Sequence, residues 1–168
     1  MSSAFGRGLA ATLAALTFST SVMAAQCAQT SEAGALRTRV IQSQAMVAAL
    51  ACGEQSRYNV FVDKFQKQLV AEGTTLRQFF ARAYGQNATA KLNEFVTAMA
   101  NRESSLSVAD RATYCLRAAE LFEGLTAIGP EKLPDLVGSW PSSESHGYDV
   151  CVQRAASTAP AKAMPAVR

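Results

Sequence analysis

The stretch SVADRATYCLRAAELFEGL, residues 107–125, combines a helix-start signal with an apolar stripe that contains a cysteine. Ser107 and Asp110 have the spacing of a capping box, in which the hydroxyl accepts from an early backbone N–H and the acid favours the positive end of the helix. Apolar residues then recur at intervals of three and four, as on one face of a helix. They are Val108, Ala112, Cys115, Ala119 and Phe122, with Leu116 and Leu125 widening the stripe. The stretch predicts a helix that turns the Cys115 thiol toward the core.

The sequence before this stretch repeats the helical pattern four times. We expect helices at 32–51, 55–71 and 75–84, and a further helix capped by Asn87 that carries Leu92, Phe95, Val96 and Met99. Gly53, Gly73 and Gly85 follow the first three, where a residue that tolerates the left-handed conformation ends a helix. No stretch alternates as a strand does. The predicted class is all-α, a compact bundle of about five amphipathic helices stapled by two disulfides.

The first 24 residues have the three-part layout of a secretory signal peptide. Arg7 precedes an apolar run from Leu9 to Phe18, and small residues lead to cleavage after Ala24 or Ala25. The run is shorter than the roughly 20 residues that span a bilayer, which leaves an uncleaved anchor as the alternative. We therefore expect a periplasmic or secreted protein with no transmembrane segment after leader removal, a single domain at 25–153 and a disordered Ala/Pro-rich tail at 154–168.

Four cysteines lie beyond this leader, at positions 27, 52, 115 and 151. Their even number and the oxidising destination indicate two structural disulfides, and the lack of a C-x-x-C motif argues against zinc or redox sites. Four cysteines allow three pairings, and sequence alone does not choose among them. If the first and fifth helices lie antiparallel, Cys52 meets Cys115, which leaves Cys27 for Cys151. We predict this pairing.

The Pro/Ser-rich segment at 129–150 is predicted to be a loop with one short helical turn at 130–137. Its Trp140 is expected to plug one end of the bundle, with a contact to a partner as the alternative. His146 is the single histidine of the chain. Ser145 and Asp149 lie close to it in sequence, but neighbours on one loop seldom converge as a triad, so a solvated loop histidine is the favoured interpretation.

No other set of residues indicates catalysis, a cofactor or a metal. Glu94, Glu103, Glu120 and Glu123 could act as acid and base, but their amphipathic setting favours a solvated outer face. The net charge of +3 includes no dense basic block, which argues against nucleic acid. One aromatic set could line an apolar ligand cavity, although such stripes are more often core. It comprises Tyr58, Phe61, Phe65, Phe79 and Phe80.

Five segments together resemble a group of small exported helical proteins of alphaproteobacteria that carry four cysteines and are mostly uncharacterised. The segments are LRTRVIQSQAMVAALACG from Leu36, YNVFVDKFQKQL from Tyr58, LRQFFARAYG from Leu76, LNEFVTAMAN from Leu92 and DRATYCLRAAELF from Asp110. The resemblance covers about half of the chain. It implies a periplasmic setting and assigns no catalytic residue.

These observations lead to three functional hypotheses. The first is a non-enzymatic helical module that binds a macromolecule or maintains the envelope, with an unknown protein or envelope component as its partner. The alternative is a carrier of a small apolar ligand between the helices. The third is an enzyme that uses carboxylates alone. No cofactor is expected for the first.

Overall fold

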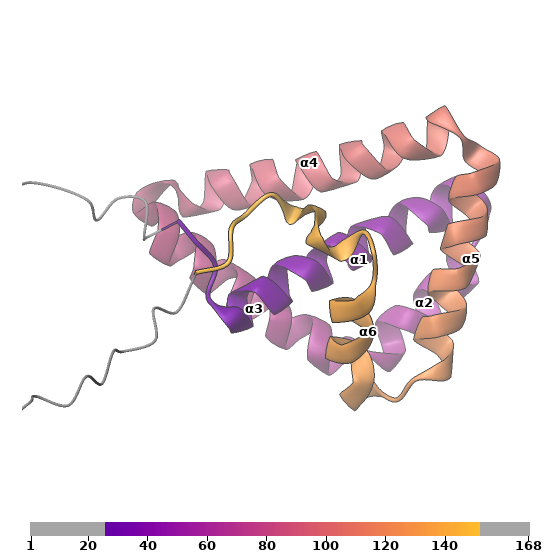
Figure 1. The fold of residues 1–168 in the computed structure, drawn as a ribbon, viewed down its shortest axis with the longest axis horizontal. Helices are drawn as coiled ribbons and strands as arrows, with labels where there is room; N and C mark the ends of the chain where they lie inside the picture. Colours follow the sequence, from indigo (N-terminus) through magenta and orange to yellow (C-terminus); the bar gives the residue numbers. More distant parts are fainter. Residues whose placement is uncertain (1–25, 152–168) are drawn as a thin grey trace, which may run out of the picture.

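The computed structural model describes residues 26–151, and this part of the chain is helical (Figure 1). An isolated bridge between Ala28 and Val150 is its only β-type pairing. The prediction of an all-α fold is confirmed. The α-helices are α1 (Thr30–Cys52), α2 (Gln55–Lys64), α3 (Gln66–Tyr84), α4 (Ala88–Ala109), α5 (Arg111–Ala127) and α6 (Leu133–Ser139). Short 3₁₀ helices lie between and after them: η2 (Gly85–Asn87), η3 (Pro130–Lys132) and η4 (Ser143–His146). The predicted leader at 1–24 and tail at 154–168 lie outside the described residues.

Helix α1 is the centre of the molecule. It contacts each of the other five α-helices and η4, and it runs through the middle of the view in Figure 1. A helix surrounded on several sides cannot carry a single apolar stripe, and α1 instead buries small residues around much of its circumference. They include Ala33, Ala35, Ala45, Ala48 and Ala49. The chain is therefore organised around α1.

The predicted start of the helix at Ser107 is wrong. Helix α4 continues through Ser107 to Ala109, and α5 begins at Arg111 with Asp110 as its N-cap. The Asp110 carboxylate accepts from the Thr113 N–H at 3.1 Å, while the Ser107 hydroxyl donates to the Ser104 carbonyl at 2.8 Å. The capping signal in the sequence is real, but Asp110 is the cap itself and not the acid three residues inside the helix.

The residues of α5 that face the core differ in part from the predicted stripe. Phe122 and Leu125 are buried as predicted, and Cys115 is half-buried. The predicted stripe members Val108 and Leu116 are exposed, with exposed fractions of 85% and 69%. The buried face of α5 consists of Tyr114, Ala118, Leu121, Phe122 and Leu125.

A second boundary also differs from the prediction. The helix expected at 55–71 ends at Lys64, because Phe65 leaves helical geometry with φ −107° and ψ 15°. Helix α3 then continues through Gly73, and the Thr75 hydroxyl donates to the Ala71 carbonyl instead of capping a new helix. The expected ends at Gly53 and Gly85 are confirmed, and Gly53 takes the left-handed φ of 78°.

Two hydrophobic clusters lie along α1. The first contains Phe61 and Phe65, with Tyr58 packed against it, and it includes the buried face of α5. The second contains Phe79 and Phe80, which pack with Tyr148 in edge-to-face contacts at centroid distances of 5.0 and 5.8 Å. The five aromatic residues that were predicted to line one ligand cavity therefore lie in two separate parts of the core.

Both predicted disulfides are present. Cys52 at the end of α1 pairs with Cys115 on α5, and Cys27 pairs with Cys151. The start of α5 lies beside the end of α1, since the Arg111 guanidinium donates to the Ala51 carbonyl. Both disulfides fit an oxidising environment.

The segment at 129–150 is more ordered than the loop that was predicted. The expected short turn at 130–137 is present as η3 and most of α6, and Leu133 and Val137 are buried. The chain then returns along α1 as η4 to reach Cys151. Within residues 26–151, no helix is both long and apolar enough to cross a membrane.

Candidate functional site

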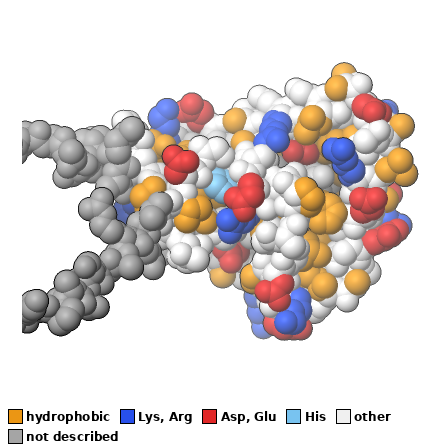
Figure 2. Space-filling view, viewed as in Figure 1, with side chains coloured by type: hydrophobic (Ala, Val, Ile, Leu, Met, Phe, Trp, Pro, Cys, Tyr) orange, Lys and Arg blue, Asp and Glu red, His pale blue; other side chains and the backbone are white. Residues whose placement is uncertain are grey.

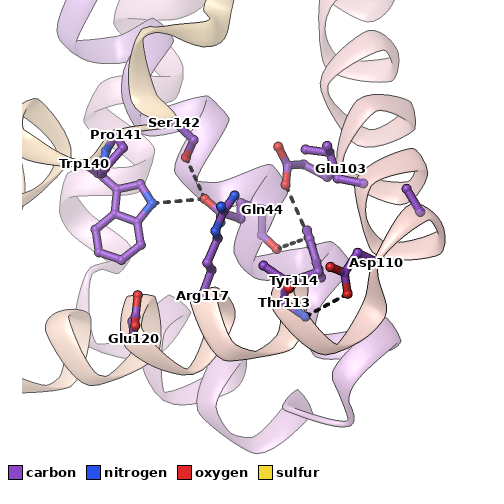
Figure 3. Close-up of a pocket in the computed structure, with 12 residues that line it drawn as sticks. Gln44, Glu103, Asp110, Thr113, Tyr114, Arg117, Glu120, Trp140, Pro141 and Ser142 are labelled. Atoms are coloured by element: carbon purple, nitrogen blue, oxygen red, sulfur yellow. Dashed lines mark hydrogen bonds between the residues drawn. The ribbon is translucent and has the colours of Figure 1, made fainter.

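An open cleft of about 720 Å³ lies where α4 meets α5, and it is the main candidate site (Figure 3). Leu106, Ala109 and Pro141 give it apolar walls. Its polar and aromatic lining consists of Gln44, Glu103, Asp110, Thr113, Tyr114, Arg117, Glu120, Trp140 and Ser142. A concave, mostly apolar surface of this size with a few placed polar groups is typical of binding sites. In Figure 2, apolar side chains reach the surface among charged ones, mainly over the half of the molecule that contains α5 and α6.

Trp140 is placed in the cleft by the proline that follows it. The ring of a proline pushes the preceding residue toward extended backbone, and Trp140 has φ −74° and ψ 127° at the end of α6. Helix α6 therefore stops at this position. The side chain is half-buried, packs against the first cluster and also lines the cleft. Trp140 was expected to plug an end of the bundle. It does pack against the core, but it also lines an open cleft, which was not predicted.

Gln44 on α1 fixes the orientation of this wall. Its Oε1 accepts from the Trp140 Nε1 at 3.2 Å and from the Ser142 hydroxyl at 2.9 Å. An indole N–H can only donate, so the side-chain oxygen of Gln44 is the atom that faces it. Gln44 is itself buried, with an exposed fraction of 5%. The indole is consequently held by a core residue and not by the surface loop alone.

Tyr114 and Glu103 form a buried polar pair at the cleft. The Tyr114 hydroxyl lies 3.3 Å from Glu103 Oε2 and 3.3 Å from the Gln44 backbone carbonyl, and its one proton is shared between two acceptors (Figure 3). Burial raises the pKa of Glu103, while the Tyr114 hydrogen bond and the charge of Arg102 lower it. Burial and then the Glu103 charge raise the pKa of Tyr114, which keeps the phenol neutral.

Three further charged side chains surround the mouth of the cleft: Asp110, Arg117 and Glu120, all of them exposed. Hydrogen bonds with Thr113 lower the pKa of Asp110, so this carboxylate remains ionised while it caps α5. Arg117 lies among these acids in Figure 3, but the ion pairs within 26–151 do not include it. The mouth is acidic overall.

The residues singled out from sequence lie in other places. None of Tyr58, Phe61, Phe65, Phe79 and Phe80 lines this cleft or a smaller cavity of about 200 Å³ between α1, α3 and α4. Among the carboxylates, Glu94, Glu120 and Glu123 are exposed as expected. Glu103 was also expected on an outer face and is buried, with an exposed fraction of 3%. It lies four residues after Met99, so it continues the apolar stripe of α4, and this spacing is the signal that could have identified it.

The expectation for His146 was also wrong. Its exposed fraction is 4%, because η4 packs against α1. The ring Nδ1 accepts from the Tyr148 N–H at 3.2 Å, and Nε2 lies 3.7 Å from a carboxylate oxygen of Glu144. Burial lowers the pKa of His146; the Glu144 charge raises it and the Arg37 charge lowers it further. His146 is a core residue of the returning segment and does not reach Asp149 in a triad-like hydrogen bond among the described contacts.

Comparisons with protein-family models, with curated proteins and with solved structures gave no significant match. Within residues 26–151, no group of three or more His, Cys, Asp or Glu side chains is placed to hold a metal ion. The cleft, with its fixed indole and buried carboxylate, is therefore the feature on which a functional proposal can be built.

Proposed function

We propose that this protein is a non-enzymatic helical module of the periplasm or the extracellular space that binds a partner macromolecule through the cleft at the α4–α5 corner. The observation that carries the proposal is the indole of Trp140, half-buried in an open apolar cleft and oriented by a buried glutamine. Tryptophan in a fixed pocket surrounded by apolar contacts is a common anchor of protein–protein interfaces. The two disulfides support an oxidising destination.

The form of the cleft favours a macromolecule over a fully enclosed ligand. It lies on the surface between helices, and Leu106 on its wall keeps an exposed fraction of 47%. With Ala109, Pro141 and Trp140 it lines one hollow, and apolar side chains gathered around an open hollow, rather than scattered singly, are typical of a surface that a partner covers. A peptide segment can enter such a cleft from the surface without any opening of the bundle.

Site-specific photo-crosslinking in the cell tests this proposal. A photoreactive residue at position 106 lies in the cleft, and one at position 70 replaces Val70, which is similarly exposed on α3 but outside the cleft. We expect a discrete adduct from position 106 that weakens in a Trp140→Ala background, and no such adduct from position 70. Equal adducts from both positions, or none from either, would contradict the proposal.

A carrier of a small apolar ligand is the second candidate, and the cleft volume of about 720 Å³ favours it, since small-molecule sites have volumes of roughly 300–1,000 Å³. Native mass spectrometry of the purified protein separates the two candidates. A carrier should retain a ligand of defined mass that Trp140→Ala releases. A macromolecule-binding module should have the mass of the disulfide-bonded chain alone.

A further inference from the structure

We propose that the occupant of the cleft presents a lysine side chain, whose ammonium group pairs with Glu103 while its alkyl stem lies along the apolar wall. This inference rests on the proposed function and specifies the chemistry of the partner. The Glu103 carboxylate has an exposed fraction of only 3% and yet lines an open cleft.

Glu103 has only part of the compensation that a buried carboxylate requires. Its one described hydrogen bond comes from the Tyr114 hydroxyl, and none of the ion pairs in the described part of the chain includes it. Its sequence neighbour Arg102 donates instead to the Ser145 carbonyl at 3.0 Å. Buried charges are normally paired, because removal from water is costly. A cation from the partner would supply the pairing.

The other charged side chains of the cleft also favour a positively charged occupant. Asp110 and Glu120 add two carboxylates to Glu103, against a single cation at Arg117. The whole chain has a net charge of +3, so the acidic excess is local to this cleft. Complementarity therefore favours a positively charged group and disfavours an anionic one.

The geometry favours an ammonium over a guanidinium. Glu103 has an exposed fraction of only 3% and its Oε2 already accepts from Tyr114, so it offers little open surface for the planar five-donor fork of a guanidinium. Lysine is a compact point charge on a four-carbon stem. That stem matches the apolar wall of Leu106, Ala109 and Pro141, and Trp140 lines the same cleft.

The pH dependence of binding follows from the groups around Glu103. Burial raises its pKa, and the neighbouring groups are Arg102 on α4 and Tyr114, Asp110, Arg117 and Glu120 on α5. Gln44 and residues 140–142 contribute no charge. An ammonium pairs with the ionised carboxylate, so affinity should increase as the pH rises through the titration of Glu103 and then stay constant until the lysine itself loses its proton near about pH 10.

Three probes test the inference: the peptide acetyl-Gly-Lys-Gly-amide, the same peptide with norleucine in place of lysine, and hexylammonium. Trp140 is the only tryptophan of the chain, so its emission reports on the cleft alone. The amide signals of Thr113 and Tyr114 in a ¹⁵N–¹H spectrum provide a second readout. We expect the lysine peptide to bind at least about tenfold more tightly than the norleucine peptide, as a charge-assisted hydrogen bond would give.

Glu103→Gln should abolish this preference, and Glu123→Gln, an exposed glutamate of α5 outside the cleft, should preserve it. The comparison of probes on the wild-type protein does not depend on how the Glu103 variant folds. Equal binding of the lysine and norleucine peptides would overturn the lysine inference, and so would no binding of either. If hexylammonium bound more tightly than the lysine peptide, the occupant would be a free amine, and the inference that a partner presents a lysine would be overturned. If both peptides bound equally, or if neither bound, adducts from position 106 would still support the proposed function. A failure of the lysine inference can therefore be distinguished from a failure of the proposed function.

Discussion

Removal of the Cys52–Cys115 disulfide should lower the free energy of unfolding by about 4.3 kcal/mol. The two cysteines are 63 residues apart in sequence, and the chain-entropy model relates this loop length to the entropy that the cross-link removes from the unfolded chain. The same model gives about 4.9 kcal/mol for Cys27–Cys151, which are 124 residues apart. With an unfolding entropy of about 2.1 cal/mol/K per residue over residues 26–151, the first loss corresponds to a melting-temperature decrease of about 16 °C.

The measurement is guanidinium denaturation of Cys52→Ala/Cys115→Ala, followed by circular dichroism, beside the wild type and Cys27→Ala/Cys151→Ala. Because the effect acts on the unfolded ensemble, the denaturant slope should also increase, since a chain without the cross-link exposes more surface when it unfolds. If the double variant does not fold, stepwise reduction of the wild type gives the same comparison. A loss below about 1 kcal/mol with an unchanged slope would refute the reasoning from loop length.

Two further predictions concern α5 and η4. Leu121→Ala should lower the free energy of unfolding by about 2–5 kcal/mol, because this side chain is fully buried. Leu116→Ala on the same helix should change it by less than about 0.5 kcal/mol, because this side chain is 69% exposed. Chemical denaturation of the two variants measures both changes, and equal losses would show that the assigned buried face of α5 is wrong. For His146, the folded-state pKa lies below the unfolded value, so the folded state resists protonation: stability is fully present above about pH 6.5 and decreases as the pH falls below it. Urea denaturation between pH 7.5 and 5 should show this decrease in the wild type and less of it in His146→Gln, and identical slopes in the two proteins would contradict the assignment.

Helix content and the helix ends at Gly53 and Gly85 were predictable because they depend on local chemistry. The 3.6-residue period of apolar positions identifies helices without reference to neighbours. A glycine after such a run ends the helix when its backbone is left-handed, as at Gly53. The same rule failed at Gly73, which lies inside α3 with helical backbone. Nothing local distinguishes these two glycines, because the difference is whether the next segment packs in line with the helix or turns away.

The candidate site was predictable only in part. Trp140 was predicted to pack over the bundle end, with contact to a partner as the alternative; it packs against the first cluster and also lines the cleft, and the partner contact stays a prediction. Its hydrogen-bond partner Gln44 was not identified, since the two residues lie 96 positions apart. The burial of Glu103 and His146 was missed because a charged or titratable side chain is usually solvated unless a neighbouring element covers it. Here α5 covers the first and α1 the second.

The sequence by itself determined the helical class and the even set of cysteines, and an assumed approach of two helices favoured the pairing that the structure confirms, while the leader at 1–24 stays a prediction. These depend on composition, period and one argument about how the first and fifth helices approach each other. The tertiary structure alone decided that α1 is the central helix, that α4 extends to Ala109, and that Gln44, Tyr114, Glu103 and Trp140 meet in one cleft. The physical reason is that a cleft is made of contacts between residues far apart in the chain, and such contacts leave no periodic trace in the sequence.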